Sequence, residues 1–375
     1  MKTQKDAITP LQFMFSITCF LRSSSLLSAF FAPISKTDSW LVVLLAAAVC
    51  LPFLWVFILL MKAFPGKNLI EINDAVFGRI AGKIISAIYI WFFFTLTSLN
   101  LRDLGSFVGK SIMIKTPQLV IVVVFILICA WAASHGLDVV TRYSVVFVII
   151  SSIILVVTIA ATTDHMNFEN FLPILRQPPK NIIQSTHIVS TIPLGELVTI
   201  LMITPQVNIK PQKIGRYFLA GFLLGALLIM LVVARDIAVL GNTITMFGLP
   251  SFETLRMVSF FEVLTHMEIL FAILLIILFF FKISLLFYVS ILAMSYLFRL
   301  DSYKPLILPC AAITAAYSFI VFESLTKHLE IGRDTAPFMW VVFEFLLPLL
   351  TLIIAYIRKL PKKEREARSK EAAKV

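Results

Sequence analysis

Ten apolar windows, each about as long as a bilayer is thick, run almost end to end along the chain. They lie at about residues 11–34, 40–61, 84–107, 118–134, 143–162, 188–205, 217–239, 269–298, 306–322 and 336–357. A helix needs about 20 apolar residues to cross a hydrocarbon core roughly 30 Å thick. Only 14% of the residues are charged, against roughly a quarter in soluble domains. The sequence therefore predicts an all-α integral membrane protein with about ten transmembrane helices in a single domain, residues 1–375.

The distribution of Lys and Arg predicts how these helices are oriented. With ten spans both termini lie on one side, and that side carries roughly twice as many Lys and Arg as the other, so we expect it to be cytoplasmic. Residues 1–10 then form a cytoplasmic N-terminus, and residues 358–375 form a basic cytoplasmic tail. We interpret the first apolar window as a retained span and not as a cleaved signal peptide. The net charge of +11 then reflects topology and contact with the lipid bilayer, so nucleic acid is not an expected partner.

Two of the windows are interrupted by residues that disfavour a continuous helix. The first contains Arg22-Ser23-Ser24-Ser25, whose hydroxyls compete with the helix for backbone hydrogen bonds. The sixth contains Pro193-Leu194-Gly195-Glu196, where proline removes a backbone donor and glycine admits unusual dihedrals. Breaks in spans one and six are expected when two five-helix repeats are inverted around a midplane ligand site. Close helix packing and simple kinks would use the same residues, so that interpretation stays open.

Four charged residues stand out within the windows: Arg22, Glu196, Lys282 and Glu344. An ionised group inside a membrane is costly unless it is paired or hydrated, so each is a candidate functional residue. Glu196 directly follows a break and could accept backbone hydrogen bonds, bind a ligand ammonium or hold a proton. For Arg22, Lys282 and Glu344 we expect a gating role or an ion pair, with Glu344 as the candidate partner of Lys282.

Two further helix faces are candidates for lining a cavity. Ser284 and Tyr288 are four residues apart and share one face, whereas Lys282 points about 200° away from Ser284. This difference favours gating or packing for the lysine over ligand binding. On the aromatic third span, Phe92 and Leu96 share a face and are the candidates if this span lines a cavity, although an aromatic cluster of this kind more often serves lipid contact and packing than a pocket.

No catalytic or metal-binding motif is evident. Residues 105–111 resemble a phosphate-binding loop but have three residues between the glycines where that motif needs four. The five histidines and four cysteines show no metal-ligand or disulfide spacing. We expect no enzymatic activity, no cofactor and no metal.

Short motifs along residues 8–359 carry a family resemblance. They are Leu69-Ile70-Glu71, Asn100-Leu101-Arg102, Thr116-Pro117, the stretch from Gly136 to Arg142, Asn170-Phe171-Leu172-Pro173, Pro193-Leu194-Gly195-Glu196 and Pro205. In this order and spacing they resemble the B subunit of spore germinant receptors, the spore germination permease family of the amino acid-polyamine-organocation superfamily. The serines at residues 23–25 depart from this family, whose members usually carry a Gly-x-Gly stretch there.

The resemblance implies a fold similar to that of the leucine transporter, with helices 1 and 6 broken. It also implies a place in the spore inner membrane and a small germinant, typically an amino acid, as ligand. The implied partners are a receptor A subunit and a lipoprotein C subunit. By this likeness the pocket involves Ser23, Ser24, Ser25, Phe92, Leu96, Leu194, Gly195, Ser284 and Tyr288. A secondary transporter of amino acids or related solutes is the alternative function, and a purely structural scaffold is a third.

Overall fold

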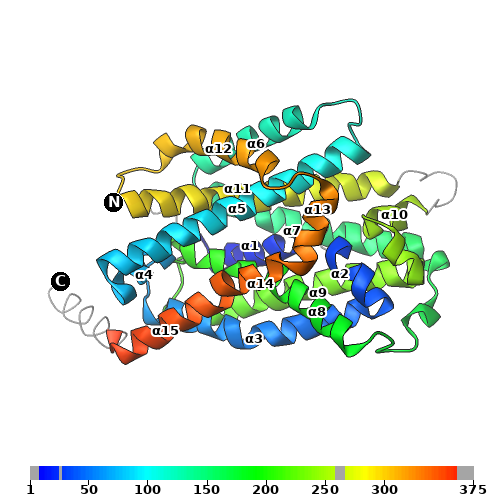
Figure 1. Ribbon diagram of the computed structural model, residues 1–375, viewed down its shortest axis with the longest axis horizontal. Coiled ribbons are helices and arrows are strands. Elements are labelled where there is room, and N and C mark those ends of the chain that lie inside the picture. Colours follow the sequence, from blue (N-terminus) through cyan, green and yellow to red (C-terminus); the bar gives the residue numbers. More distant parts are fainter. Residues whose placement is uncertain (1–7, 25–27, 258–266, 361–375) are drawn as a thin grey trace.

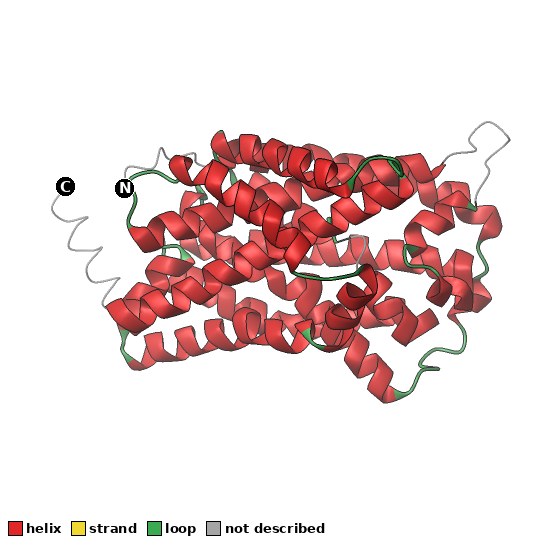
Figure 2. Cartoon of the chain, turned by 45° about the horizontal axis from the view of Figure 1, so that its top comes forward, coloured by secondary structure: helices red, strands yellow, loops and turns green. Residues whose placement is uncertain are grey.

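The computed structural model describes residues 8–24, 28–257 and 267–360, and within these ranges the chain is helical (Figures 1 and 2). The only β-type pairing among them is an isolated bridge between Ile8 and Val207. The α-helices are α1 Pro10–Arg22, α2 Ser28–Ser35, α3 Ser39–Ala63, α4 Leu69–Phe77, α5 Arg79–Ser111, α6 Gln118–Ser134, α7 Leu137–Thr162, α8 Pro179–Val189, α9 Pro211–Leu240, α10 Pro250–Arg256, α11 Met267–Phe298, α12 Ile307–Ile320, α13 Leu325–Asp334, α14 Ala336–Val341 and α15 Leu347–Ile357. Short 3₁₀ and π turns join several of them, notably η2 Lys36–Asp38, η5 Ser190–Leu194, η6 Gly195–Met202, η8 Gly241–Met246 and η10 Val342–Leu346.

Seven helical stretches in the described ranges are long and apolar enough to cross a membrane. They are Ser28–Ala63, Arg79–Ser111, Leu137–His165, Pro179–Met202, Pro211–Met246, Glu268–Phe298 and Ala336–Ile357. Gln118–Ser134 and Lys304–Ile320 are shorter apolar helices. The first stretch covers parts of two predicted windows, which a turn at Lys36 separates, since Lys36 has a left-handed φ of 49°. The count of ten spans stays a prediction.

The helical backbone is interrupted in the first and sixth predicted spans. α1 begins at a capping box formed by Thr9 and Gln12 and ends at Arg22, and helix resumes at Ser28. In the sixth, α8 passes into η5, where Ile192 leaves the helical region with φ −112° and ψ 102° just before Pro193. Because proline has no backbone N–H, the helix ladder has no donor at this point.

The two interruptions lie inside the bundle. α1 packs against α9 and α7, and α11 packs against α5, α6 and α7. α4 and α15 lie together at one end of the bundle, on the left in Figure 1, while α10 lies at the opposite end. The short α13 packs against α2 and α14. α11 therefore contacts both interrupted segments, through α1 and η6, and α13 lies against α2, which follows the first interruption.

Candidate functional site

A cavity of about 280 Å³ lies between the two interrupted helices. Ser24 lines it from the end of α1, and Ile192 and Glu196 line it from the second interruption. Most of its other walls are apolar or aromatic, and they include Trp91, Leu96, Phe279, Tyr317, Met339 and Trp340. A mostly apolar cavity with a few polar groups is the usual form of a small-molecule site.

An ion pair joins the two interruptions at one wall of this cavity. The Lys282 Nζ lies 2.6 Å from a carboxylate oxygen of Glu196 and donates to the Ser24 hydroxyl at 2.8 Å. It also lies 4.9 Å from the centre of the Phe20 ring. Both charged residues are only 2% exposed. Lys282 of α11 therefore connects the end of α1 to the start of η6.

The partner that we expected for Lys282 is wrong, because Lys282 pairs with Glu196 and not with Glu344. Glu344 lies in η10, is 0% exposed, and has no hydrogen-bond partner among the described residues. Its carboxyl group lies against Gly195, where a β-carbon added to the glycine would come within 2.7 Å of the Glu344 carboxyl carbon. A glycine at position 195 is what allows η10 to approach the second interruption this closely.

One hydroxyl that lines the cavity was not anticipated from the sequence. The Thr95 Oγ1 is buried and has no hydrogen-bond partner among the described residues. Buried polar atoms are normally satisfied, so this hydroxyl is available to a ligand or a water molecule. Three residues earlier in α5, Phe92 stacks on Phe343 with a centroid separation of 5.0 Å and also contacts Trp340.

The helix α13 lines part of the cavity through His328, Ile331 and Gly332. His328 Nε2 lies 2.8 Å from an Asp103 carboxylate oxygen, and its ring meets the Phe30 ring edge-on at 5.5 Å. Arg333 donates to the carbonyls of Ala29 and Phe30, which ties α13 to α2. A second cavity of about 270 Å³ lies on the other side and shares Phe30, Asp103 and His328 with the first. These three residues therefore stand between the two cavities.

The charge of His328 depends on Asp103. Burial lowers the pKa of His328, but the adjacent Asp103 carboxylate raises it by more, so the net pKa lies above the ordinary value for histidine. Protonation of the imidazole therefore strengthens its contact with Asp103, which joins α13 to α5.

The structure separates the predicted site residues into three groups. Ser24, Leu96, Glu196 and Lys282 line the cavity, and Ser25 lies outside the described residues. Just behind the walls, the Ser23 hydroxyl lies 2.6 and 2.7 Å from the carbonyls of Cys19 and Leu278. Five other predicted residues are buried but do not line the cavity: Phe92, Pro193, Leu194, Gly195 and Glu344.

The third group lies elsewhere in the bundle. Ser284 is buried and does not line the cavity, and the Tyr288 hydroxyl lies 3.1 Å from the Gln206 side-chain nitrogen. Lys282 lines the cavity and Ser284 does not, although we expected the serine to line the pocket and the lysine to have a gating or packing role. Arg22 is buried toward α7 and α9, where it and Arg235 line a small cavity of about 10 Å³.

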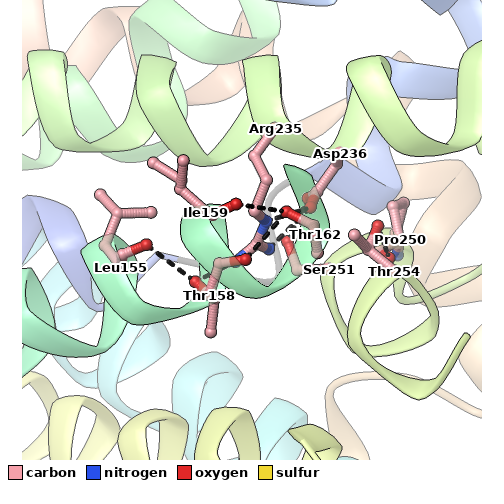
Figure 3. Close-up of polar contacts among 9 residues, drawn as sticks. All are labelled: Leu155, Thr158, Ile159, Thr162, Arg235, Asp236, Pro250, Ser251 and Thr254. Carbon is pink, nitrogen blue, oxygen red and sulfur yellow. Dashed lines mark hydrogen bonds and ion pairs between the residues drawn. The ribbon is translucent and has the colours of Figure 1, made fainter. Parts of the chain in front are cut away.

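A second buried polar cluster was also missed from the sequence. Arg235 of α9 donates to the Thr158 hydroxyl at 2.8 Å and to its neighbour Asp236 at 2.7 Å, while Ser251 of α10 donates to the other Asp236 oxygen (Figure 3). Arg235 and Asp236 lie inside a predicted window, so two adjacent opposite charges in an apolar window were the available signal. This cluster fixes α10 to α9 and α7, and α10 in turn lines the second cavity through Glu253.

The polar groups and aromatic walls of the cavity suit the binding of a small polar molecule. No group of three or more His, Cys, Asp or Glu side chains in the described ranges is arranged to hold a metal ion. The cavity instead offers a buried ammonium, two carboxylates, a free hydroxyl and aromatic walls.

Residues 7–326 match the family model described as "Spore germination protein". The chain belongs to this family. It is 25% identical to spore germination protein KB of Bacillus subtilis (strain 168) over 99% of this chain and 100% of that protein. It is 24% identical to the putative spore germination protein YfkT of the same organism, over 85% of this chain and 87% of that one. The family expected from the sequence is confirmed, and the protein is a multi-pass membrane protein of this family.

Solved structures show the fold. Mhp1, a nucleobase-cation-symport-1 family transporter with bromovinylhydantoin bound, superposes with a TM-score of 0.68 at 14% identity, over 87% of this chain and 75% of that chain. MhsT in complex with L-phenylalanine gives 0.57 at 10% identity, over 92% and 98%. The expected leucine-transporter type of fold is therefore confirmed.

Proposed function

We propose that this protein is the ligand-binding B-type subunit of a nutrient germinant receptor, and that it binds a small germinant in the 280 Å³ cavity. The observation that carries this proposal is that the cavity is lined by both helix interruptions at once, through Ser24, Ile192 and Glu196. A ligand that contacts both interrupted helices can favour one arrangement of them over another and so shift the conformation of the protein.

The charges of the cavity favour a small zwitterion, such as an amino acid. Lys282 can receive a carboxylate, and Glu196 can receive an ammonium, since the two lie side by side at 2.6 Å. The Thr95 hydroxyl adds an unpaired polar group, and Trp91 and Trp340 offer apolar surface for a side chain. In this scheme the Ser24 hydroxyl, which accepts a hydrogen bond from Lys282, binds the ligand in place of main-chain amides.

The relatives support a role inside a receptor complex. Among them are two spore germination proteins of Bacillus subtilis (strain 168), A2 and B2. Protein A2 is 24% identical over 52% of this chain, and B2 is 24% identical over 28% of it. We propose that the protein acts in the spore inner membrane with an A subunit and a lipoprotein C subunit, and with both termini on the core side.

Spores that carry cavity variants test this proposal. Leu96 is 1% exposed and lines the cavity, so Leu96→Trp should fill it and abolish the response to a germinant that the wild-type protein senses. Leu223→Trp makes the same substitution at a position that is 50% exposed on the outer face of α9 and should leave the response unchanged. Protein levels are compared by immunoblot. Equal responses in the two variants at equal protein levels would contradict the proposal.

A secondary transporter is the second candidate, because the structural neighbours include transporters such as the Na⁺-coupled sialic acid symporter, with a TM-score of 0.64. The purified protein in liposomes would then accumulate a radiolabelled amino acid against its gradient when an ion gradient is imposed. Binding without uptake favours the receptor subunit.

A further inference from the structure

Glu344 is a buried carboxyl group that ligand binding does not explain. It is 0% exposed, lies within a stretch long and apolar enough to span the membrane, and neither of its oxygens has a hydrogen-bond partner among the described residues. An ionised carboxylate in that position would have lost its hydration without gaining a hydrogen bond or a salt bridge. A neutral carboxylic acid avoids most of this cost.

The groups around Glu344 point to the same conclusion. The charged groups that act on it are Glu196 of η6 and Lys282 of α11. The nearby Cys50 thiol of α3 and Tyr89 phenol of α5 are ordinarily neutral, and they donate to the backbone carbonyls of Ser190 and Phe343. Two carboxylates therefore share one ammonium in an apolar setting, which leaves one negative charge uncompensated.

We propose that this cluster binds one proton, held on Glu344, so that Glu196, Lys282 and Glu344 together are neutral. The proton comes from a hydronium ion of the surrounding water: one of its O–H bonds breaks, an O–H bond forms on the Glu344 carboxylate, which becomes a carboxylic acid, and a water molecule is left. Glu196 remains the ion-pair partner of Lys282 because the two are in contact at 2.6 Å, whereas the Glu344 carboxyl group packs against Gly195. The bound species is a proton, and the close contact with Gly195 leaves little room for a larger cation.

Such a proton would be linked to the ligand cavity through Lys282. This step rests on the proposed function: a ligand ammonium that reached Glu196 would free Lys282 to move toward Glu344, and Glu344 would then release its proton. Ligand binding and proton release are reciprocal in that case.

Infrared spectroscopy of the purified full-length protein in lipid nanodiscs tests the proton site without any ligand. A protonated carboxyl group gives a C=O stretch that is separate from those of ionised carboxylates and shifts in D₂O. We expect this band in the wild-type protein at neutral pH and its loss in Glu344→Gln. The control is Glu330→Gln, the same change at a glutamate whose side chain is 57% exposed and paired with Lys327, and it should keep the band.

Two further variants test whether one proton is shared by the cluster. In Glu196→Gln, Glu344 becomes the only carboxylate for Lys282, so the band should disappear. In Lys282→Met, no ammonium remains, so both carboxyl groups should be protonated and the band should grow about twofold. The Lys282→Met result also keeps the proposal testable should Glu344→Gln fail to fold.

An unchanged band in folded Glu344→Gln would overturn the assignment to Glu344. A band that persists in Glu196→Gln would overturn the shared charge. Since none of these measurements involves a germinant, a failure here is distinguishable from a failure of the proposed receptor function.

Discussion

The contact between Gly195 and Glu344 makes a sharp prediction for Gly195→Ala. The backbone at Gly195 has φ −72° and ψ −30°, which alanine adopts readily, so any cost must come from packing. The new β-carbon would lie 2.7 Å from the Glu344 carboxyl carbon and 3.0 Å from Phe345 Cζ. Overpacking of this kind costs about 1–3 kcal/mol, and the gain in helix propensity offsets at most about 1 kcal/mol of it. We expect a net loss of about 1–2 kcal/mol in the free energy of unfolding.

Equilibrium unfolding with SDS in mixed micelles measures this loss. Gly109→Ala is the matched control, because its β-carbon would meet Ile121 at 3.6 Å, an ordinary contact, and it should be neutral or slightly stabilising. Adding Glu344→Ala to Gly195→Ala removes the clashing carboxyl and should recover about 1 kcal/mol in a double-mutant cycle. If Gly195→Ala is as stable as Gly109→Ala, or if Glu344→Ala recovers nothing, the close approach of η10 to the second interruption is refuted.

Three other predictions concern the groups around the cavity. The folded pKa of His328 lies above its ordinary value of about 6.5, so the His328–Asp103 pair stabilises the protein fully below pH ~6.5, and this contribution is lost as pH rises through the folded pKa. Thermal unfolding measured over a pH series should show this loss of stability in the wild-type protein. An identical pH profile in Asp103→Asn would contradict the prediction. Ser251→Ala should lower the free energy of unfolding by about 1.5–3 kcal/mol, because it removes a buried donor to the Asp236 carboxylate. It should also speed hydrogen exchange in α10. Exchange at the wild-type rate would show that Ser251 does not anchor α10. Lys282→Met should reduce the yield of folded protein, because the buried Glu196 carboxyl loses its ammonium partner and must take up a proton to stay buried. Lys282→Met/Glu196→Gln should restore part of the yield, and a double variant with a lower yield than the single one would argue against the ion pair.

The membrane fold was predictable because apolar length alone nearly determines it. The ten windows follow from composition, and the two interruptions follow from residues that compete with a helix, the serines after Arg22 and Pro193 in η5. The polar helix α13 was not predicted, because its residues lie in a short, charged segment between two apolar windows. His328 and its partner Asp103 were missed with it, although Asp103 lies inside a predicted window.

The inward face of α11 could not be read from the sequence. This helix is packed on several sides by α1, α5, α6 and α7, so apolar residues occur all round it. The hydrophobic periodicity therefore does not indicate which of its faces points toward the cavity. The angle between Lys282 and Ser284 was therefore predictable, but not which of them faces the cavity. Similarly, the choice of Glu196 over Glu344 as partner of Lys282 depends on the path of the chain after Ile192, which spacing does not encode.

Direct binding to the purified protein tests the central claim, that a small germinant binds between the two interrupted helices. Radiolabelled L-amino acids would be screened one at a time against wild type, Leu96→Trp and Leu223→Trp in nanodiscs by scintillation proximity. We predict saturable binding of at least one of them to wild type and Leu223→Trp, and at least tenfold weaker binding to Leu96→Trp, equivalent to about 1.4 kcal/mol. Equal affinity for all three proteins would place the ligand outside this cavity and contradict the account.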